Sequence, residues 1–185
     1  MAGELDNFTL LRAQKNEPSA CKALVTIYQK PVTALLWRMM TSQGKQQLVE
    51  DLVQETFLRV FRSLGSFQPE GSARLSTWIL TIATRLALNE LRRKSREEPL
   101  SPSYAEQQSS AQADELLRQR LLAQALERAL ASLQPEYRAV FLLSEYHQCS
   151  QQDIAEMLTI PSGTVKSRLS RARKHMKEQL REHLP

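Results

Sequence analysis

The apolar residues of this 185-residue chain recur at intervals of three and four along most of its length. That spacing gives an α-helix one apolar face, whereas the strict alternation typical of β-strands is absent. Only five glycines occur, and the helix-favouring residues Ala, Leu, Gln, Arg and Glu are abundant. The sequence therefore predicts an all-α fold.

One polar segment, EEPLSPSYAEQQSSAQ, interrupts the helical pattern at residues 97–112. Its prolines, serines and glutamines leave no apolar period. We interpret residues 97–113 as a flexible linker between two small helical domains, residues 1–96 and residues 114–185. In the first domain the apolar spacing predicts helices at about residues 5–15, 18–42, 46–64 and 73–96.

Basic and acidic residues are unevenly distributed. Residues 1–97 contain 14 basic and 9 acidic residues, residues 98–165 contain 4 and 9, and residues 166–185 contain 7 and 2. A solvated face explains any single basic cluster. Two basic ends around an acidic middle fit a chain that meets nucleic acid at two places.

Composition also excludes several classes of protein. No apolar run approaches the roughly 18–20 residues that span a bilayer, and the polar start resembles no signal peptide. We therefore expect a cytoplasmic protein with no direct membrane insertion. Cys21 and Cys149 are too few for a disulfide framework, and neither has a partner at metal-ligand spacing. No metal and no cofactor is expected.

The strongest local pattern is a helix-turn-helix near the C-terminus. Ser150 and Asp153 form a capping pattern at the start of a helix whose predicted buried side is Ile154, Ala155, Met157 and Leu158. The helix must stop before Pro161, because the residue preceding a proline is displaced from the α region. Ser162 is the expected N-cap of the next helix. The second helix would pack through Val165, Leu169, Ala172 and Met176.

The opposite face of that second helix is basic and polar. Lysine and arginine donate to guanine or phosphate, and a serine hydroxyl takes either role, so this face suits the major groove. Basic amphipathic helices also lie on membranes or bind proteins, but those uses do not need a capped helix and a proline turn upstream. The predicted DNA-contacting residues are Lys166, Ser167, Ser170, Arg171 and Lys174.

Two helices of the first domain carry polar faces. In LVEDLVQETFLRVFRSL, the polar face includes Asp51, Gln54, Glu55, Leu58 and Arg59, and periodicity alone favours ordinary solvation of it. In the helix at 73–96, the residues expected outside are Thr77, Thr81, Arg85, Asn89, Arg92, Arg93 and Arg96. Beside a loop that carries Phe67, this face suits single-stranded nucleic acid, with an ordinary basic surface as the alternative.

Two blocks of the sequence resemble one family. DLVQETFLRVFRSLGSF, followed by STWILTIATRLALNELRRKSR, resembles conserved region two of the extracytoplasmic-function (ECF) sigma factors of the sigma-70 family. LLSEYHQCSQQDIAEMLTIPSGTVKSRLSRARKHM resembles their region four, in the same order across a variable linker. The resemblance implies a non-enzymatic sigma factor that binds core RNA polymerase and directs promoter-specific initiation in a stress or envelope response.

The resemblance also assigns roles to the polar faces. It implies that Asp51, Gln54, Glu55, Leu58 and Arg59 bind the β′ clamp helices of the polymerase, and that region four contacts the β subunit and minus-thirty-five DNA. It implies minus-ten contacts by Phe67, Gln68, Arg85, Leu88, Asn89, Arg92 and Arg93. Family members often have asparagine at the position of Arg85, and some have a larger residue at that of Ser170. An anti-sigma factor, soluble or membrane-bound, is a further expected partner.

Three other classes of protein were compared with this interpretation. A ligand-responsive regulator would bind paired half-sites as a dimer, but residues 1–96 show no pocket motif and carry a second basic helix. An enzyme is disfavoured because no nucleophile elbow, phosphate loop or metal-ligand pair occurs, and His147, His175 and His183 lie scattered at surface-like positions. A structural adaptor leaves the two DNA-suited faces unexplained.

Overall fold

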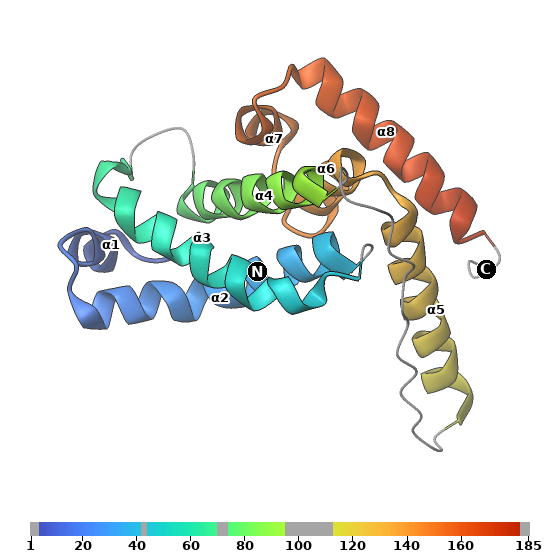
Figure 1. The fold of residues 1–185 in the computed structure, drawn as a ribbon, viewed down its shortest axis with the longest axis horizontal. Coiled ribbons are helices and arrows are strands. Elements are labelled where there is room, and N and C mark those ends of the chain that lie inside the picture. Colours follow the sequence, from blue (N-terminus) through green and yellow to red (C-terminus); the bar gives the residue numbers. More distant parts are fainter. Residues whose placement is uncertain (1–3, 42–43, 70–73, 95–112, 182–185) are drawn as a thin grey trace.

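The computed structural model describes residues 4–41, 44–69, 74–94 and 113–181, and every regular element among them is a helix. Their order is shown in Figure 1: α1 (Asn7–Gln14), α2 (Pro18–Met40), η2 (Gln46–Leu48), α3 (Val49–Ser63), η3 (Leu64–Ser66), α4 (Leu75–Lys94), α5 (Ala113–Ser132), α6 (Pro135–Glu145), α7 (Gln151–Leu158) and α8 (Ser162–Gln179). The all-α prediction is confirmed. The predicted linker lies outside the described residues, except Ala113, which begins α5.

The helix ends follow local signals. Asp6 caps α1 by accepting a hydrogen bond from the backbone N–H of Thr9 at 2.9 Å. Pro18 is the first residue of α2, where its missing N–H leaves no acceptor unpaired. The helix expected at 46–64 is divided into a 3-10 turn, α3 and a second 3-10 turn.

Helices α1–α4, called here the first helix group, pack around α2. The buried side of α2 is apolar from end to end and includes Leu24, Val32, Leu35, Leu36 and Met39. The chain start is bound to this helix, because the Tyr28 hydroxyl accepts from the backbone N–H of Leu5 and donates to the Glu4 carboxylate. Burial raises the pKa of Tyr28, so the hydroxyl keeps the proton that it donates.

Helices α5–α8 form the second helix group, in which α6 and α8 pack closely together. Val140, Leu142 and Leu143 of α6 are fully buried. The two groups are in contact, since α4 packs against α6 and α7, and α2 packs against α5 and α6. Figure 1 shows α4 in green between α2 and α3 on one side and α7 on the other. One continuous apolar core therefore extends through both groups.

The central position of α4 corrects one expectation. Thr77 was expected on the outside of this helix, but its side chain is only 8% exposed. Helices α2, α3, α6 and α7 all pack on α4, so α4 has a narrower solvent face than a surface helix with the same periodicity. Arg85, Asn89, Arg92 and Arg93 remain exposed, as predicted.

Candidate nucleic-acid interface

The helix-turn-helix begins with a complete capping box. The Ser150 hydroxyl accepts from the backbone N–H of Asp153 at 3.0 Å, and the Asp153 carboxylate accepts from the backbone N–H of Ser150 at 3.0 Å. Two of the unpaired donors at the start of α7 are thereby satisfied. The predicted cap is confirmed, and Ile154, Ala155 and Met157 are buried as expected, with Leu158 partly buried.

The turn between α7 and α8 differs from the prediction in its last residue. Thr159 ends α7 in the left-handed region, with φ 55° and ψ 50°. The N-cap of α8 is Pro161, and no side chain caps this helix. Ser162 was expected to be the cap but is the first helical residue, because the proline already provides the extended backbone that precedes the helix.

Helix α8 presents the predicted face to solvent. Val165, Leu169, Ala172 and Met176 are 0–4% exposed, and they hold α8 on the rest of its group. Every predicted DNA-contacting residue of this helix is exposed: Lys166, Ser167, Ser170, Arg171 and Lys174. A rigid helix with one buried stripe and one basic face is the geometry that places side chains in a major groove.

Two arginines of α8 differ in their contacts. Arg171 donates through Nη1 to the Tyr137 hydroxyl at 3.2 Å, which orients its guanidinium at the edge of the exposed face. Arg173 donates twice to the Glu145 carboxylate, at 2.7 and 3.1 Å, and links α8 to α6. Arg171 therefore belongs to the candidate interface, whereas Arg173 is already neutralised by an ion pair.

A second basic surface lies on α4. Asn89, Arg92 and Arg93 are exposed, and Arg93 lies 3.4 Å from Glu90. Leu88, which was predicted beside them, is 6% exposed and belongs to the core. The structure therefore exposes Asn89, Arg92 and Arg93 on α4, whereas Leu88 is buried.

The loop residue Phe67 is partly buried rather than free. Its ring packs against Trp78 with centroids 5.2 Å apart, and its carbonyl accepts from Gln14 Nε2 at 2.7 Å. Gln68, the next residue, is exposed. The loop is therefore bound to α1 and α4 at Phe67 and presents Gln68 to solvent.

Arg85 projects from α4 to the second helix group. Its Nε donates to the Met157 carbonyl at 2.9 Å, and its Nη2 donates to Thr159 Oγ1 at 3.1 Å. Arg92 also faces that group, with Nε 3.6 Å from the Glu136 carboxylate. Two of the predicted minus-ten residues therefore contact the helix-turn-helix domain in this structure.

The predicted polar face of α3 is also exposed. Asp51, Gln54, Leu58 and Arg59 are open to solvent, and Glu55 is partly so. Arg59 donates to Glu55 at 2.6 Å, one helical turn away. Leu58 is 51% exposed in the middle of this face, among these charged and polar side chains.

Arg138 is a residue whose importance the sequence analysis did not identify. It is 2% exposed, and its guanidinium donates to the carbonyls of Leu130, Ala131, Leu133 and Met39 at 2.6–2.8 Å. Burial lowers the pKa of Arg138 to about 10, so the group stays charged at neutral pH. The sequence signal that could have identified it is an arginine within the apolar run YRAVFLL.

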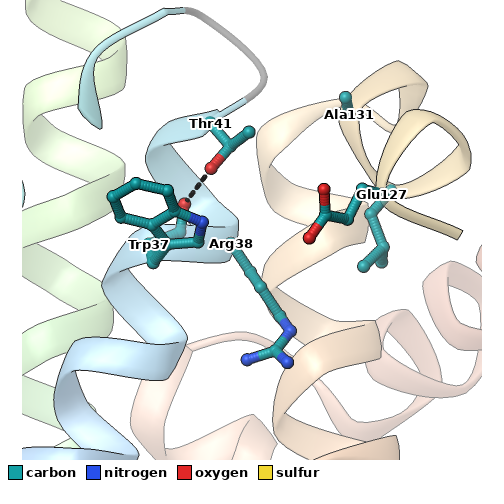
Figure 2. Close-up of a pocket in the computed structure, with 6 residues that line it drawn as sticks. Trp37, Arg38, Thr41, Glu127 and Ala131 are labelled. Atoms are coloured by element: carbon teal, nitrogen blue, oxygen red, sulfur yellow. Dashed lines mark hydrogen bonds between the residues drawn. The ribbon is translucent and has the colours of Figure 1, made fainter. Parts of the chain in front are cut away.

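A small cleft separates the end of α2 from α5. It is lined by Trp37, Arg38, Thr41, Glu127, Leu130 and Ala131 (Figure 2). Figure 2 shows the Thr41 hydroxyl directed back to the carbonyl of Trp37, to which it donates at 2.7 Å. Among the described residues no group of three or more His, Cys, Asp or Glu could hold a metal ion, here or elsewhere.

Cys149, His147 and His175 are each partly buried. Burial and the nearby Asp153 carboxylate raise the pKa of the Cys149 thiol to about 11, so it stays protonated and weakly nucleophilic at neutral pH. His147 was expected at the surface but is partly buried beside Arg38, and His175 contacts Ser132 at 2.7 Å. His183 lies outside the described residues.

In the part of the chain that the structure describes, no helix has the length and apolarity to cross a membrane.

Two family models match this chain, one in each helix group. The family model of sigma-70 region 2 matches residues 24–97, and that of sigma-70 region 4 matches residues 123–176. The ECF RNA polymerase sigma factor SigW of Bacillus subtilis is 30% identical over 92% of this chain and 94% of its own. The ECF RNA polymerase sigma-E factor of Haemophilus influenzae is 31% identical over 97% and 98%.

One solved structure has a similar fold. It is the sigma factor RpoE of Bartonella quintana in a crystal with the anti-sigma factor NepR. The two chains are 25% identical, with a TM-score of 0.68, over 86% of this chain and 96% of that one. The similarity therefore extends over both helix groups.

Proposed function

This chain belongs to the ECF sigma factors of the sigma-70 family. We propose that, in promoter-specific initiation, its two basic surfaces contact promoter DNA and the polar face of α3 contacts the polymerase. As a sigma factor it binds core RNA polymerase and directs that enzyme to promoters. The observation that carries the proposal is the exposed face of α8, which combines lysine, serine and arginine on a helix held by a buried stripe.

The proposed DNA contacts follow the two basic surfaces. The α8 face, Lys166, Ser167, Ser170, Arg171 and Lys174, would read minus-thirty-five duplex from the major groove. Gln68, Arg85, Asn89, Arg92 and Arg93 would contact the opened minus-ten strand. A flipped base costs a few kcal/mol to unstack, and polar and aromatic contacts offset that cost. Phe67 and Leu88 would support this surface from their partly and fully buried positions.

The face of α3 is the proposed docking site for the β′ clamp helices. Asp51, Gln54, Glu55, Leu58 and Arg59 present charges around an exposed leucine. Such a mixed patch binds a helical partner through the apolar centre and gains orientation from the charged rim. The second helix group would contact the β subunit, so that residues 1–96 and 114–185 act as separate modules on either side of the linker.

The remaining proposals concern regulation and place of action. An anti-sigma factor would hold the protein inactive by covering polymerase- and DNA-binding surfaces until a stress signal releases it. The similarity to a sigma factor crystallised with an anti-sigma factor supports this proposal. The protein would act in the cytoplasm, where promoter DNA and polymerase are located, and it would carry no catalytic activity of its own.

Reconstitution with purified bacterial core polymerase tests the function directly. We expect the full-length protein to be retained by immobilised core enzyme and to initiate transcription from a subset of a promoter-fragment library, with core enzyme alone as the control. Sequences shared by the active fragments would define both promoter elements. No retention by core enzyme, together with dimeric binding to paired half-sites, would contradict the proposal and favour a ligand-responsive regulator.

A further inference from the structure

Gln14, the last residue of α1, is bonded to the turn that follows α3. Its Nε2 donates to the Leu64 carbonyl at 3.0 Å and to the Phe67 carbonyl at 2.7 Å. Both partners are acceptors, so the amide nitrogen rather than the amide oxygen faces the turn, with one N–H for each carbonyl. Leu64 is the first residue of η3, and Phe67 is its C-cap. Gln14 therefore holds both ends of this turn.

Glu4 makes a second contact, on the other side of the loop that follows the turn. One oxygen of its carboxylate accepts from the hydroxyl of Ser76, in the first turn of α4, and the other accepts from the Tyr28 hydroxyl of α2 at 2.5 Å. The N-terminal segment, residues 4–14, is therefore placed relative to α2 and α4 at once, while Gln14 at its end reaches the turn before the loop.

The N-terminal segment is fixed by the core of the first helix group. The Tyr28 hydroxyl accepts from the backbone N–H of Leu5 at 3.1 Å. Leu10 and Ala13 of α1 are buried in the apolar core, and α1 packs along α2. The position of Gln14 is therefore set by α2 and not by the turn that it holds.

The turn determines how Gln68 is presented. Gln68 is exposed and follows Phe67, whose ring packs on Trp78 with centroids 5.2 Å apart. The Phe67 carbonyl that Gln14 holds belongs to the peptide unit that joins Phe67 to Gln68. A polar side chain discriminates between bases only when its donors and acceptors are held to within about 0.5 Å. A hydrogen bond to that peptide unit restricts the direction in which Gln68 leaves the turn.

We propose that Gln14 is a positioning residue for minus-ten recognition, which holds the turn so that Gln68 meets one base in one geometry. The inference rests on the proposed function in one respect, the contact of Gln68 with the opened minus-ten strand. Gln14 acts through the backbone of the turn and makes no contact with DNA in this role. Residues 4–14 precede the stretch that the region 2 family model matches, residues 24–97.

The variant Gln14→Met tests the proposal, because methionine keeps the length of the side chain and removes both donors. The full-length protein is assembled with core polymerase. Its affinity is then measured for single-stranded DNA with the minus-ten sequence found in transcription, and for the same DNA with one base changed at a time. The ratio of the two affinities is the base preference at each position, and Gln68→Ala identifies the position that depends on Gln68.

We expect Gln14→Met to lower the base preference at that position about three- to tenfold, as for the loss of one neutral hydrogen bond. Preferences at the other positions should stay at wild-type values. In the double variant with Gln68→Ala, Gln14→Met should have no further effect, because its action passes through Gln68. A general loss of structure would instead reduce the preference at every position and would add to the effect of Gln68→Ala.

Two further variants serve as controls. Gln14→Lys keeps N–H donors at this position and should preserve the base preference, and its added charge cancels in a ratio measured at one salt concentration. Gln29→Met makes the same replacement at an exposed glutamine of α2 and should behave as wild type.

Hydrogen exchange in the free protein separates this inference from the proposed function. The Phe67 N–H donates to the Leu64 carbonyl at 3.0 Å, so its exchange rate, measured by NMR, reports whether the turn is held. We expect Gln14→Met to raise this rate about threefold or more and Gln14→Lys to leave it unchanged.

Three results would overturn the inference: an unchanged exchange rate in Gln14→Met, an unchanged base preference, or an equal loss of preference at every position. Failure of the wild-type protein to bind polymerase would contradict the sigma-factor assignment instead. The exchange rates would still decide whether Gln14 holds the turn.

Discussion

Arg171 is the residue of α8 whose position best separates DNA reading from structural support. Its guanidinium is exposed and oriented by Tyr137. We expect Arg171→Ala to weaken duplex binding by about 1–3 kcal/mol, since a base- or phosphate-directed guanidinium is lost, and to reduce base preference or salt dependence. The measurement is fluorescence anisotropy on minus-thirty-five duplex over a salt series.

Arg173 provides the matched control on the same helix. It is paired with Glu145 on α6, so Arg173→Ala should leave duplex affinity nearly unchanged at matched salt. Equal losses in the two variants would mean that net positive charge, rather than the Arg171 side chain, determines the affinity.

The partly buried His147 should make the free energy of unfolding depend on pH. Burial, with a smaller effect of Arg38, lowers its pKa from 6.5 to about 4. As the pH falls from 6.5 to about 4, the imidazole of the unfolded chain takes up a proton that the folded chain excludes. Acidification through this interval therefore lowers the free energy of unfolding, and the effect levels off below about pH 4. Above 6.5 it is neutral in both states and has no such effect.

Urea titrations of wild type and His147→Gln across that pH interval check this sign. The wild type should lose more stability on acidification than His147→Gln, which cannot take up the proton. The prediction is wrong if the difference in the free energy of unfolding between the two proteins is the same at neutral pH as near pH 4.

At the level of single elements, the two helices of the helix-turn-helix, α7 and α8, differ in how their N-termini are capped. Ser150→Ala removes a hydroxyl that accepts from Asp153 and should lower the free energy of unfolding by about 1 kcal/mol. Ser162→Ala should change it by only a few tenths, because Ser162 caps nothing. Urea unfolding monitored by circular dichroism compares the free energies of unfolding of the two variants. A comparable loss in Ser162→Ala would mean that Ser162 caps α8, as the sequence predicted.

Helix α3 yields a prediction about polymerase binding. Gln54→Ala should weaken binding to core polymerase severalfold, and Asp51→Arg should weaken it more because it reverses a charge at the interface. Duplex affinity should stay unchanged in both. Gln47→Ala, which alters another exposed glutamine just before α3, is the control for the core-binding assay. If all three variants bind core enzyme like wild type, the α3 face is merely solvated.

At the level of the whole molecule, Arg138 joins the two helix groups. A lysine ammonium cannot reproduce the planar, forked arrangement of N–H donors of the guanidinium. Arg138→Lys would therefore leave some of the four carbonyls without a hydrogen bond. We expect a loss of about 2–4 kcal/mol in the free energy of unfolding and separate unfolding of the two groups. Calorimetry measures both, with Arg128→Lys on the exposed side of α5 as the control. A single unchanged transition would exclude a bridging role.

Much of the fold and part of the site follow from the sequence. The helices, the capping box at Ser150 and the exposed faces of α3 and α8 were predicted correctly, since each depends on residues within about four positions of one another. Arg138 was missed, and Thr77 and His147 were placed on the surface incorrectly, because burial depends on which helices pack on a residue. Periodicity within one helix does not contain that information.

The sequence by itself determined an all-α chain with a helix-turn-helix and a basic reading face, because short-range spacing and capping chemistry specify helices and their faces. Only the tertiary structure decided that Arg85 is bound by the α7 turn and that Arg138 reaches α2. Those hydrogen bonds join residues 72 to 99 positions apart. Such contacts form when helices from both ends of the chain pack on one core, and no local pattern encodes them.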